Sequence, residues 1–272
     1  MGVKCVIRTY KSGRVIEKSK FYVDERVKVR RGRVKGNTGA AKRDANARAA
    51  VKACARTLNC NADCHDVLVT CKYTDGWLGE FSGLDEQGKR VTDWKRQDEL
   101  TAKALRKFRT ALRKRGVELR ALWVHSEIDG ETGRPVRPHV HIVLMGGGVE
   151  FRDGEWWIGE KTVTELWGMG STYTEPLHEQ VDYTPLAVYL LRQARRGENV
   201  KSYSCTRNLK KPEISEQVVT TAGAMKAPAR ALLLESGEYN IETGCHYIRY
   251  LAPEKKSVGG RENNVLHERR NR

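Results

Sequence analysis

The chain has 272 residues, of which 31% are charged, and a formal net charge of +16 at neutral pH. No apolar run approaches the roughly 20 residues that a membrane-spanning helix needs, and the N-terminus lacks the apolar block of a signal peptide. Seven scattered cysteines are typical of reduced thiols rather than of a disulfide framework. These features predict a soluble intracellular protein of one or two domains, without a membrane partner.

The positive charge is unevenly distributed along the chain. Residues 1–60 contain seventeen Lys or Arg against four Asp or Glu, and segments 93–115 and 192–211 are also strongly basic. Residues 118–182 instead contain five basic and twelve acidic side chains. Basic flanks around an acidic middle predict a polyanionic partner, nucleic acid, held on both sides of a cation-binding centre.

The first sixty residues begin with an ambiguous stretch and end in a helix. Residues 1–37 alternate short apolar stretches with Lys and Arg, which is compatible with strands or with an arm that becomes ordered on DNA. From Thr38 to Leu58 the apolar residues follow helical spacing, and basic residues lie elsewhere around the helix. We therefore expect a basic helix packed against the main domain.

Four potential zinc ligands lie close together around the end of this predicted helix: Cys54, Cys60, Cys64 and His65. Their spacing is not that of paired C-x2-C motifs, and Cys54 belongs to the apolar face of the helix. Because free cysteine is a common buried apolar residue, the pattern favours packing over a zinc site.

A strand is predicted at 66–73 and a surface loop at 76–88. The loop contains Gly83, Gly88 and Lys89 at the spacing of a phosphate-binding loop. Position 90 is Arg instead of the Ser or Thr that binds magnesium, and no buried strand leads into the segment. We therefore infer no nucleotide-hydrolysing domain in this chain.

The strongest predicted helix spans 93–115, with Leu100, Ala104, Phe108, Ala111 and Leu112 on its apolar stripe. Two strands follow, 117–127 and 137–145, and the Gly- and Asp-rich turn between them predicts antiparallel pairing. This order of elements predicts an α+β fold, with an antiparallel central sheet and helices packed on one face of it.

The rest of the chain gives a weaker pattern. The expected elements are a hairpin at 149–158, a short helix at 162–167, a strand near 171–177, a helix at 184–196, a short helix near 227–234 and a basic tail at 254–272.

The strand at 137–145 carries two histidines, His139 and His141. Side chains alternate along a strand, so both imidazoles point to one side while Val140, Ile142 and Leu144 pack behind them. Two imidazoles on one face can bind the same cation. The alternative is that each histidine is simply hydrogen-bonded on a half-exposed face of the sheet.

The run from Glu127 through Arg137 and the His139-Val140-His141 strand, followed by a tyrosine on a later helix, resembles the HUH endonucleases. It is most similar to the rolling-circle replication initiators of small phages and plasmids, over about residues 40–212. The resemblance implies an HUH/RRM-like core with the ferredoxin-like order β-α-β-β-α-β. It also implies metal-dependent, sequence-specific nicking and rejoining of single-stranded DNA through a 5′-phosphotyrosine intermediate.

The resemblance further implies a role for each site residue. His139, His141 and Glu127 would bind Mg²⁺ or Mn²⁺, with His125 and Asp129 as competitors for the role of Glu127. Tyr189 would be the nucleophile, with Tyr183 as its rival. Arg192 stands where the family usually has lysine, which favours phosphate binding over proton transfer because arginine rarely gives up its proton.

The remaining expectations concern domains and partners. We expect a basic N-terminal segment (1–60), a catalytic domain (61–212) and a C-terminal extension (213–272). The partners implied are single-stranded origin DNA and a host helicase and polymerase, in the cytoplasm of a bacterial host. A relaxase or single-strand transposase, or a non-catalytic nucleic-acid-binding protein, remains the alternative. The side chains expected to contact DNA are Arg31, Arg33, Lys35, Arg137, Arg195, Arg196, Lys201, Arg207, Lys210 and Lys211.

Overall fold

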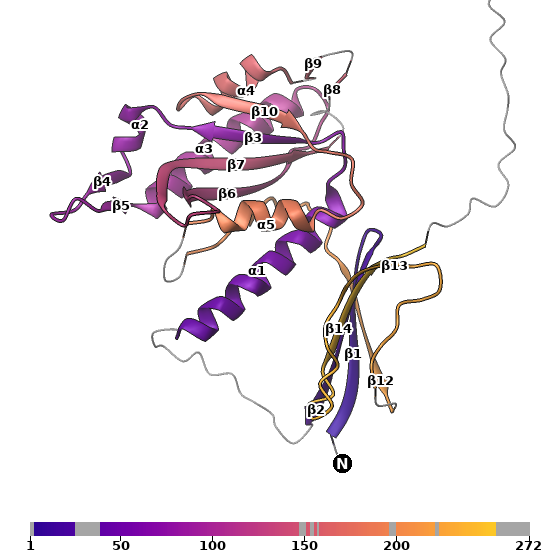
Figure 1. Ribbon diagram of the computed structural model, residues 1–272. Coiled ribbons are helices and arrows are strands. Elements are labelled where there is room, and N and C mark those ends of the chain that lie inside the picture. The colour runs from indigo at the N-terminus through magenta and orange to yellow at the C-terminus, as the bar shows by residue number, and fades with distance from the viewer. Residues whose placement is uncertain are drawn as a thin grey trace, which may run out of the picture.

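The computed structural model describes residues 3–24, 39–146, 151–152, 155–156, 158–195, 200–220 and 223–253. This part of the chain is an α+β structure with two five-stranded antiparallel sheets (Figure 1). The predictions for the arm at 25–37 and the tail at 254–272 lie outside the described residues. No helix in the described ranges combines the length and the apolar character needed to cross a membrane.

The central sheet has the strand order β10-β3-β7-β6-β11. Its strands are β3 (Val67–Lys72), β6 (Arg120–Ile128), β7 (Pro135–Met145), β10 (Thr172–Pro176) and the short edge strand β11 (Ser204–Cys205). Strands β6 and β7 pair antiparallel, as the turn between them predicted. The longest strand, β7, lies in the middle and pairs with β3 on one side and β6 on the other.

Five helices accompany the central sheet: α1 (Ala40–Asn61), α2 (Asp75–Gly79), α3 (Trp94–Arg113), α4 (Glu160–Trp167) and α5 (Thr184–Arg192). Helix α3 begins where the Asp93 carboxylate accepts hydrogen bonds from the backbone N–H groups of Lys95 and Arg96. Its predicted apolar stripe is buried except for Ala111, which is half-buried, and this confirms the helix expected at 93–115.

The helices cover both faces of the central sheet, whereas the sequence predicted one. Helices α3 and α4 pack on the face that carries Val140, Ile142 and Leu144. Helices α1 and α5 pack on the other face, against Val143 and Met145. A strand whose two faces are both covered must be apolar on both faces. The central place of β7 therefore explains the continuous run of apolar residues at its end.

The second sheet, which we call the terminal sheet, joins the two ends of the described chain in the order β12-β1-β2-β14-β13. Its strands are β1 (Val3–Ser12), β2 (Val15–Asp24), β12 (Glu213–Val219), β13 (Leu232–Ser236) and β14 (His246–Leu251). The sequence had left residues 1–37 open between strands and an arm, and 3–24 form a hairpin. The helix expected near 227–234 is wrong, since Leu232 begins β13.

Three further predicted elements can be compared with the structure, and two of them differ from it. The loop expected at 76–88 contains part of α2 and the strand β4 (Ser82–Leu84), which pairs with β5 (Arg90–Thr92) just after the loop. The expected hairpin at 149–158 is represented by β8 (Phe151–Arg152) and β9 (Glu155–Trp156). Helix α5 ends at Arg192 instead of 196, because the next residues form backbone hydrogen bonds with the end of β6.

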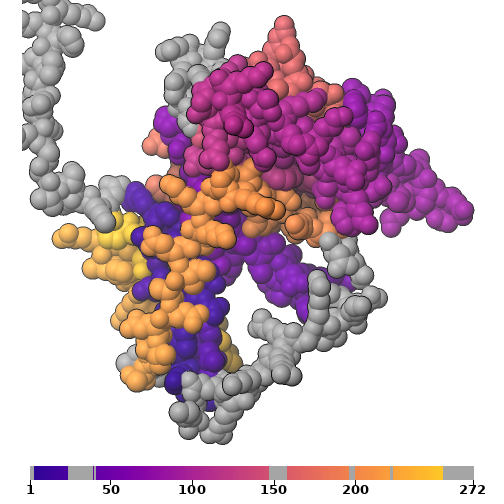
Figure 2. All heavy atoms as spheres, turned by 180° about the vertical axis from the view of Figure 1, so that it is seen from behind, coloured from indigo at the N-terminus to yellow at the C-terminus, as the bar shows by residue number. Residues whose placement is uncertain are grey.

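The terminal sheet meets the larger body at the second half of α1, whereas residues 41–49 of that helix are exposed (Figures 1 and 2). Glu17 on β2 is 3% exposed and accepts two hydrogen bonds from the Arg56 guanidinium, at 3.0 and 2.7 Å. The hydroxyl of Tyr247 donates to the same carboxylate. The turn between β1 and β2 has glycine at position 13, where a Cβ atom would lie 2.5 Å from the Asn59 carbonyl oxygen of α1.

We expect the Glu17→Gln variant to loosen the terminal sheet, because it leaves the Arg56 cation buried without its counter-charge. Removing one partner of a buried ion pair costs about 3 kcal/mol. The opening free energy of the β1 and β2 amides, measured by hydrogen exchange, is expected to fall by about that amount.

Glu216→Gln is the matched control, since Glu216 pairs with Arg8 in the same sheet at 52% side-chain exposure. That variant is expected to change the opening free energy by less than about 1 kcal/mol. Equal losses in both variants would show that burial of the Glu17–Arg56 pair does not hold the sheet in place.

Candidate functional site

The central strand β7 places His139 and His141 on the face of the sheet that α5 covers. The antiparallel register sets His141 opposite Thr70 of β3 and Val124 of β6, and sets His139 opposite Ser126 of β6. Directly opposed residues share a face, so Val124, in the apolar cluster under α5, identifies the side to which the histidines point. The predicted alternation of histidines and core residues along this strand is confirmed.

The two imidazoles turn their Nε2 atoms toward each other, at a separation of 3.1 Å. The Nδ1 atom of His139 lies 2.9 Å from the carbonyl oxygen of Arg137, which can only accept, so Nδ1 carries the proton. The Nδ1 atom of His141 lies 3.1 Å from the hydroxyl of Thr70. Each ring is oriented through Nδ1, which leaves Nε2 available as a ligand.

The environment keeps both imidazoles neutral near neutral pH. Burial lowers the pKa of His139, and the hydrogen bond to the Arg137 carbonyl opposes this effect only in part. Burial and the neighbouring His139 lower the pKa of His141 to about 4. A neutral imidazole offers a nitrogen lone pair, and metal binding requires that form.

Helix α5 brings Tyr189 against this pair. The ring centroids of Tyr189 and His141 are 5.6 Å apart, and Tyr189 is 48% exposed. The rival Tyr183 is 3% exposed, ahead of the helix in the apolar cluster around Leu190, and burial raises its pKa. Of the two tyrosines, only Tyr189 lies beside the histidines and open to a large substrate.

Gln193 is the site residue that the sequence analysis missed. Its side chain lies close enough to both His139 and His141 to raise the pKa of each imidazole against the effect of burial. The side-chain nitrogen of Gln193 donates to the Tyr189 carbonyl at 3.5 Å. The signal was present in the sequence, because Gln193 follows Tyr189 by four residues, one helical turn. The backbone after α5 lies against β6, where the Gln193 carbonyl accepts a hydrogen bond from the Glu127 N–H.

The structure does not bring the Glu127 carboxylate to the histidines. Its neighbours are Thr92, Arg90 and Arg195, and one of its oxygens is buried without a hydrogen-bond partner in the described part of the chain. Burial raises the pKa of this carboxyl, and Arg195 partly offsets the shift. Ser126, one residue earlier, is opposite His139, so alternation turns Glu127 to the other face.

The two competitors for the role of Glu127 also lie away from the histidines. His125 is buried on the α3 side, where its Nε2 atom lies 3.0 Å from the Thr101 hydroxyl and burial lowers its pKa to about 3. The Asp129 carboxylate accepts hydrogen bonds from Glu131 and Thr132 within the β6–β7 turn.

The donors around the histidine pair suit a divalent cation. A metal–nitrogen bond of about 2.1 Å places two ligands at right angles about 3.0 Å apart, close to the observed Nε2 separation of 3.1 Å. Within the described ranges, no three His, Cys, Asp or Glu side chains are grouped to hold a metal. We therefore expect the side-chain amide of Gln193 to supply the third donor, since a cation of the Mg²⁺ or Mn²⁺ type accepts an amide oxygen as ligand.

Arg195 is a structural residue rather than the predicted DNA contact. Its side chain is 5% exposed and donates to Asp98 at 2.8 Å and to the Gln97 side chain at 2.9 Å. Its backbone N–H donates to the carbonyl of His125 on β6. A guanidinium enclosed by these partners cannot reach a phosphate, and it instead fastens the end of α5 to β6 and α3.

The other basic residues predicted to contact DNA are spread over the surface. Arg137 lies at the start of β7, paired with Asp75 at 2.7 Å and hydrogen-bonded to the Tyr73 carbonyl. Arg192 is exposed at the end of α5, one turn from Tyr189. Exposed positions are also held by Lys201, Arg207, Lys210 and Lys211. Arg31, Arg33, Lys35 and Arg196 lie outside the described residues.

Of the cysteines near the end of α1, Cys54 packs as an apolar residue, as the sequence predicted. Cys54 is fully buried in the apolar cluster under α1 and α5, and burial raises the pKa of its thiol to about 12. Cys60 and Cys64 are half-buried, and in the described chain they form no metal-binding group with His65.

Comparison with known proteins adds no relative. No family model matches the chain, and neither a curated protein nor a solved structure matches it.

We expect Mn²⁺ to bind at the histidine pair and Gln193 to contribute to its affinity. His139→Ala or His141→Ala is expected to weaken Mn²⁺ binding by about 100-fold, and Gln193→Ala by about ten-fold. Electron paramagnetic resonance of free Mn²⁺ during titration measures these affinities without any substrate.

Glu127→Gln is the control for this titration, and its Mn²⁺ affinity is expected to stay within about two-fold of the unmodified protein. A ten-fold loss in Glu127→Gln together with no loss in Gln193→Ala would return the third ligand position to Glu127.

Proposed function

We propose that the protein is an HUH-type endonuclease that nicks and rejoins single-stranded DNA through Tyr189 and so starts rolling-circle replication. The single observation that carries the proposal is the meeting of four groups on one surface. These are the facing Nε2 atoms of His139 and His141, the Gln193 amide and the exposed ring of Tyr189. A phenol beside a cation site is the arrangement that phosphoryl transfer to tyrosine requires.

The order of the elements supports this proposal. Apart from the short inserted elements α2, β4, β5, β8 and β9, the chain from β3 to β10 has the order β-α-β-β-α-β, formed by β3, α3, β6, β7, α4 and β10. Their strands lie in the order β10-β3-β7-β6. We take this arrangement as support for the proposed ferredoxin-like core of an HUH/RRM-like domain. Both crossover helices lie on the α3 side, which leaves the histidine face to α5 and α1.

The proposed reaction assigns a task to each residue. The Tyr189 oxygen attacks phosphorus and loses its proton, an O–P bond to tyrosine forms, and the bond from phosphorus to the 3′ oxygen breaks. The departing oxygen gains a proton and becomes a free 3′-hydroxyl, while the DNA stays on the protein as a 5′-phosphotyrosine. A bound divalent cation would neutralise charge on the phosphate oxygens. The reverse reaction rejoins the strand, because the phosphodiester energy is kept in the covalent intermediate.

Two side chains orient the site for this chemistry. Arg192, exposed one helical turn from Tyr189, is proposed to hold a phosphate of the bound strand. Thr70 and the Arg137 carbonyl hold the two imidazoles through Nδ1, so that both Nε2 atoms point to the same place. The partners of this reaction are proposed to be origin DNA and a host helicase and polymerase, in the cytoplasm of a bacterial host.

We expect transfer of a DNA label to Tyr189. Random-sequence single strands labelled at the 3′ end are incubated with the protein and Mn²⁺, and the 3′ fragment stays covalently attached through its 5′ phosphate. Tyr189→Phe is expected to reduce labelled protein by at least about 100-fold, because the attacking oxygen is absent. Mass spectrometry of the labelled peptide identifies the linked residue.

Tyr183→Phe is the matched control and is expected to transfer label at the unmodified level, since that hydroxyl is buried among apolar groups. Label transfer that survives Tyr189→Phe and disappears in Tyr183→Phe would overturn the assignment of the nucleophile. An absence of label transfer with every DNA tested would favour a non-catalytic nucleic-acid-binding protein.

Removal of the metal should stop label transfer without releasing the DNA. With EDTA in excess we expect no covalent product, and readdition of Mg²⁺ or Mn²⁺ should restore it. Binding of single-stranded DNA, followed by fluorescence anisotropy, is expected to change by less than about three-fold, because phosphate contacts to Lys and Arg do not need the cation. Full label transfer in EDTA would contradict a metal-dependent site.

A further inference from the structure

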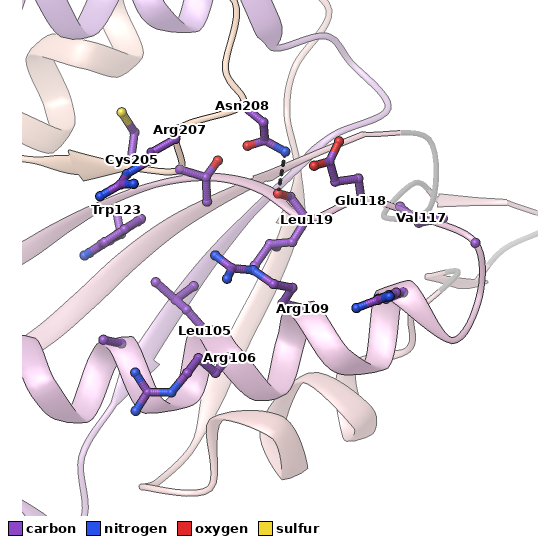
Figure 3. Close-up of a pocket in the computed structure, with 14 residues that line it drawn as sticks. Leu105, Arg106, Arg109, Val117, Glu118, Leu119, Trp123, Cys205, Arg207 and Asn208 are labelled. Atoms are coloured by element: carbon purple, nitrogen blue, oxygen red, sulfur yellow. Dashed lines mark hydrogen bonds between the residues drawn. The ribbon is translucent and has the colours of Figure 1, made fainter.

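A groove of about 930 Å³ lies on the face of the central sheet that α3 covers, the face opposite the histidines. Figure 3 shows it between α3 on one side and the start of β6 with the segment around β11 on the other. None of the groups proposed for strand cleavage lines it. The groove is therefore separate from the site described above.

The walls of the groove are strongly basic. Arg106, Arg109 and Arg113 form a stripe along α3, and Arg207 faces them from the opposite wall. Seven residues separate the first and last of the stripe, so it extends roughly 10 Å along the helix. In Figure 3, the Arg109 side chain extends from the helix toward β6, across the space that the groove encloses.

These four guanidinium groups have no hydrogen-bond or ion-pair partner among the residues that the structure describes. All four are exposed, and within the described ranges none of them forms an ion pair or donates a side-chain hydrogen bond. Glu118 is the one acidic residue among those that line the groove. Four uncompensated positive charges around one hollow complement a chain of phosphates.

The floor of the groove is apolar and includes an aromatic ring. Leu105 is buried there, and Trp123 on β6 is half-buried, packed at the edge of the cluster under α3. An indole that is only partly covered offers a surface on which an unpaired base can stack. Bases in a duplex already stack on one another and present no free face to such a ring.

The remaining wall carries a group that can hydrogen-bond a base. The side-chain amide of Asn208 donates to the Leu119 carbonyl at 3.1 Å, as the dashed line in Figure 3 marks. Its own oxygen has no protein partner in the described part of the chain and stays available as an acceptor. Positive charge, an aromatic floor and this amide together match the elements of single-strand recognition.

We propose that this groove binds a segment of single-stranded DNA, separate from the segment held at the histidines. The choice of DNA over RNA rests on the proposed function, whereas the preference for a single strand rests on Trp123 and the arginines. Because the groove and the histidines lie on opposite faces of one sheet, a DNA strand bound in the groove does not cover Tyr189. One protein molecule can then hold DNA on one face while the other face carries out the proposed reaction.

The test measures binding of labelled oligothymidylate by fluorescence anisotropy in EDTA, so that no cleavage occurs. Arg109→Ala/Arg113→Ala is expected to weaken binding at least ten-fold and to reduce the slope of log affinity against log salt by about 1.4. Trp123→Leu is expected to weaken binding about five-fold or more, and Trp123→Phe much less, since phenylalanine still stacks.

Lys103→Ala/Lys114→Ala is the matched control, because both lysines are exposed, Lys103 on α3 and Lys114 directly after it, and neither lines the groove. This variant loses the same charge and is expected to stay within about two-fold of the unmodified protein. Photocrosslinking of a bromodeoxyuridine oligonucleotide, followed by peptide mapping, is expected to modify the β6 peptide that contains Trp123.

Equal losses in the two double variants would overturn the groove and point to general surface charge. If the groove variants weaken binding of a DNA duplex as strongly as they weaken binding of oligothymidylate, single-strand binding is overturned. If oligouridylate binds more tightly than oligothymidylate, the choice of DNA is overturned. Label transfer to Tyr189 is scored separately, so the cleavage proposal can fail while the groove proposal stands, and the reverse.

Discussion

The position of β7 in the middle of the central sheet is the constraint on which the rest of the site depends. Hydrogen bonds hold the strand on both edges, and helices cover both of its faces. A shift of register by one residue would exchange the two faces and move His139 and His141 into the apolar cluster beneath α3. Packing therefore fixes the register of β7 in which both imidazoles point toward α5.

A second constraint acts after the end of α5, where the buried Arg195 side chain donates hydrogen bonds to Gln97 and to the half-exposed Asp98. The network and the backbone bonds to β6 stop the helix after Arg192 and draw the chain across the sheet. Gln193 reaches the histidines because of that turn. Substitutions at Arg195 would thus act on the site indirectly, through the position of Gln193 and Tyr189.

The two faces of the central sheet carry different sets of charged and polar groups. The histidine face carries Tyr189 and the exposed Arg192, whereas the α3 face carries the arginine-lined groove. The terminal sheet adds a third surface, anchored to α1 by Glu17 and Arg56. Arg249 of β14 also contacts Asp182 and Thr184, where α5 begins. The sheet made from the chain ends therefore supports the helix that carries the tyrosine.

The sequence by itself determined the elements whose signal is local. The alternation of β7, the apolar stripe of α3 and the pairing of β6 with β7 were predictable, because strand and helix periods are properties of neighbouring residues. So were the shared direction of His139 and His141 and the α+β class. Only the tertiary structure decided how distant segments meet: the chain ends joined in one sheet, Glu127 turned away from the histidines, and Arg195 buried beside Asp98. Gln193 came within reach of the imidazoles for the same reason, since a contact across fifty residues depends on packing that no local pattern records.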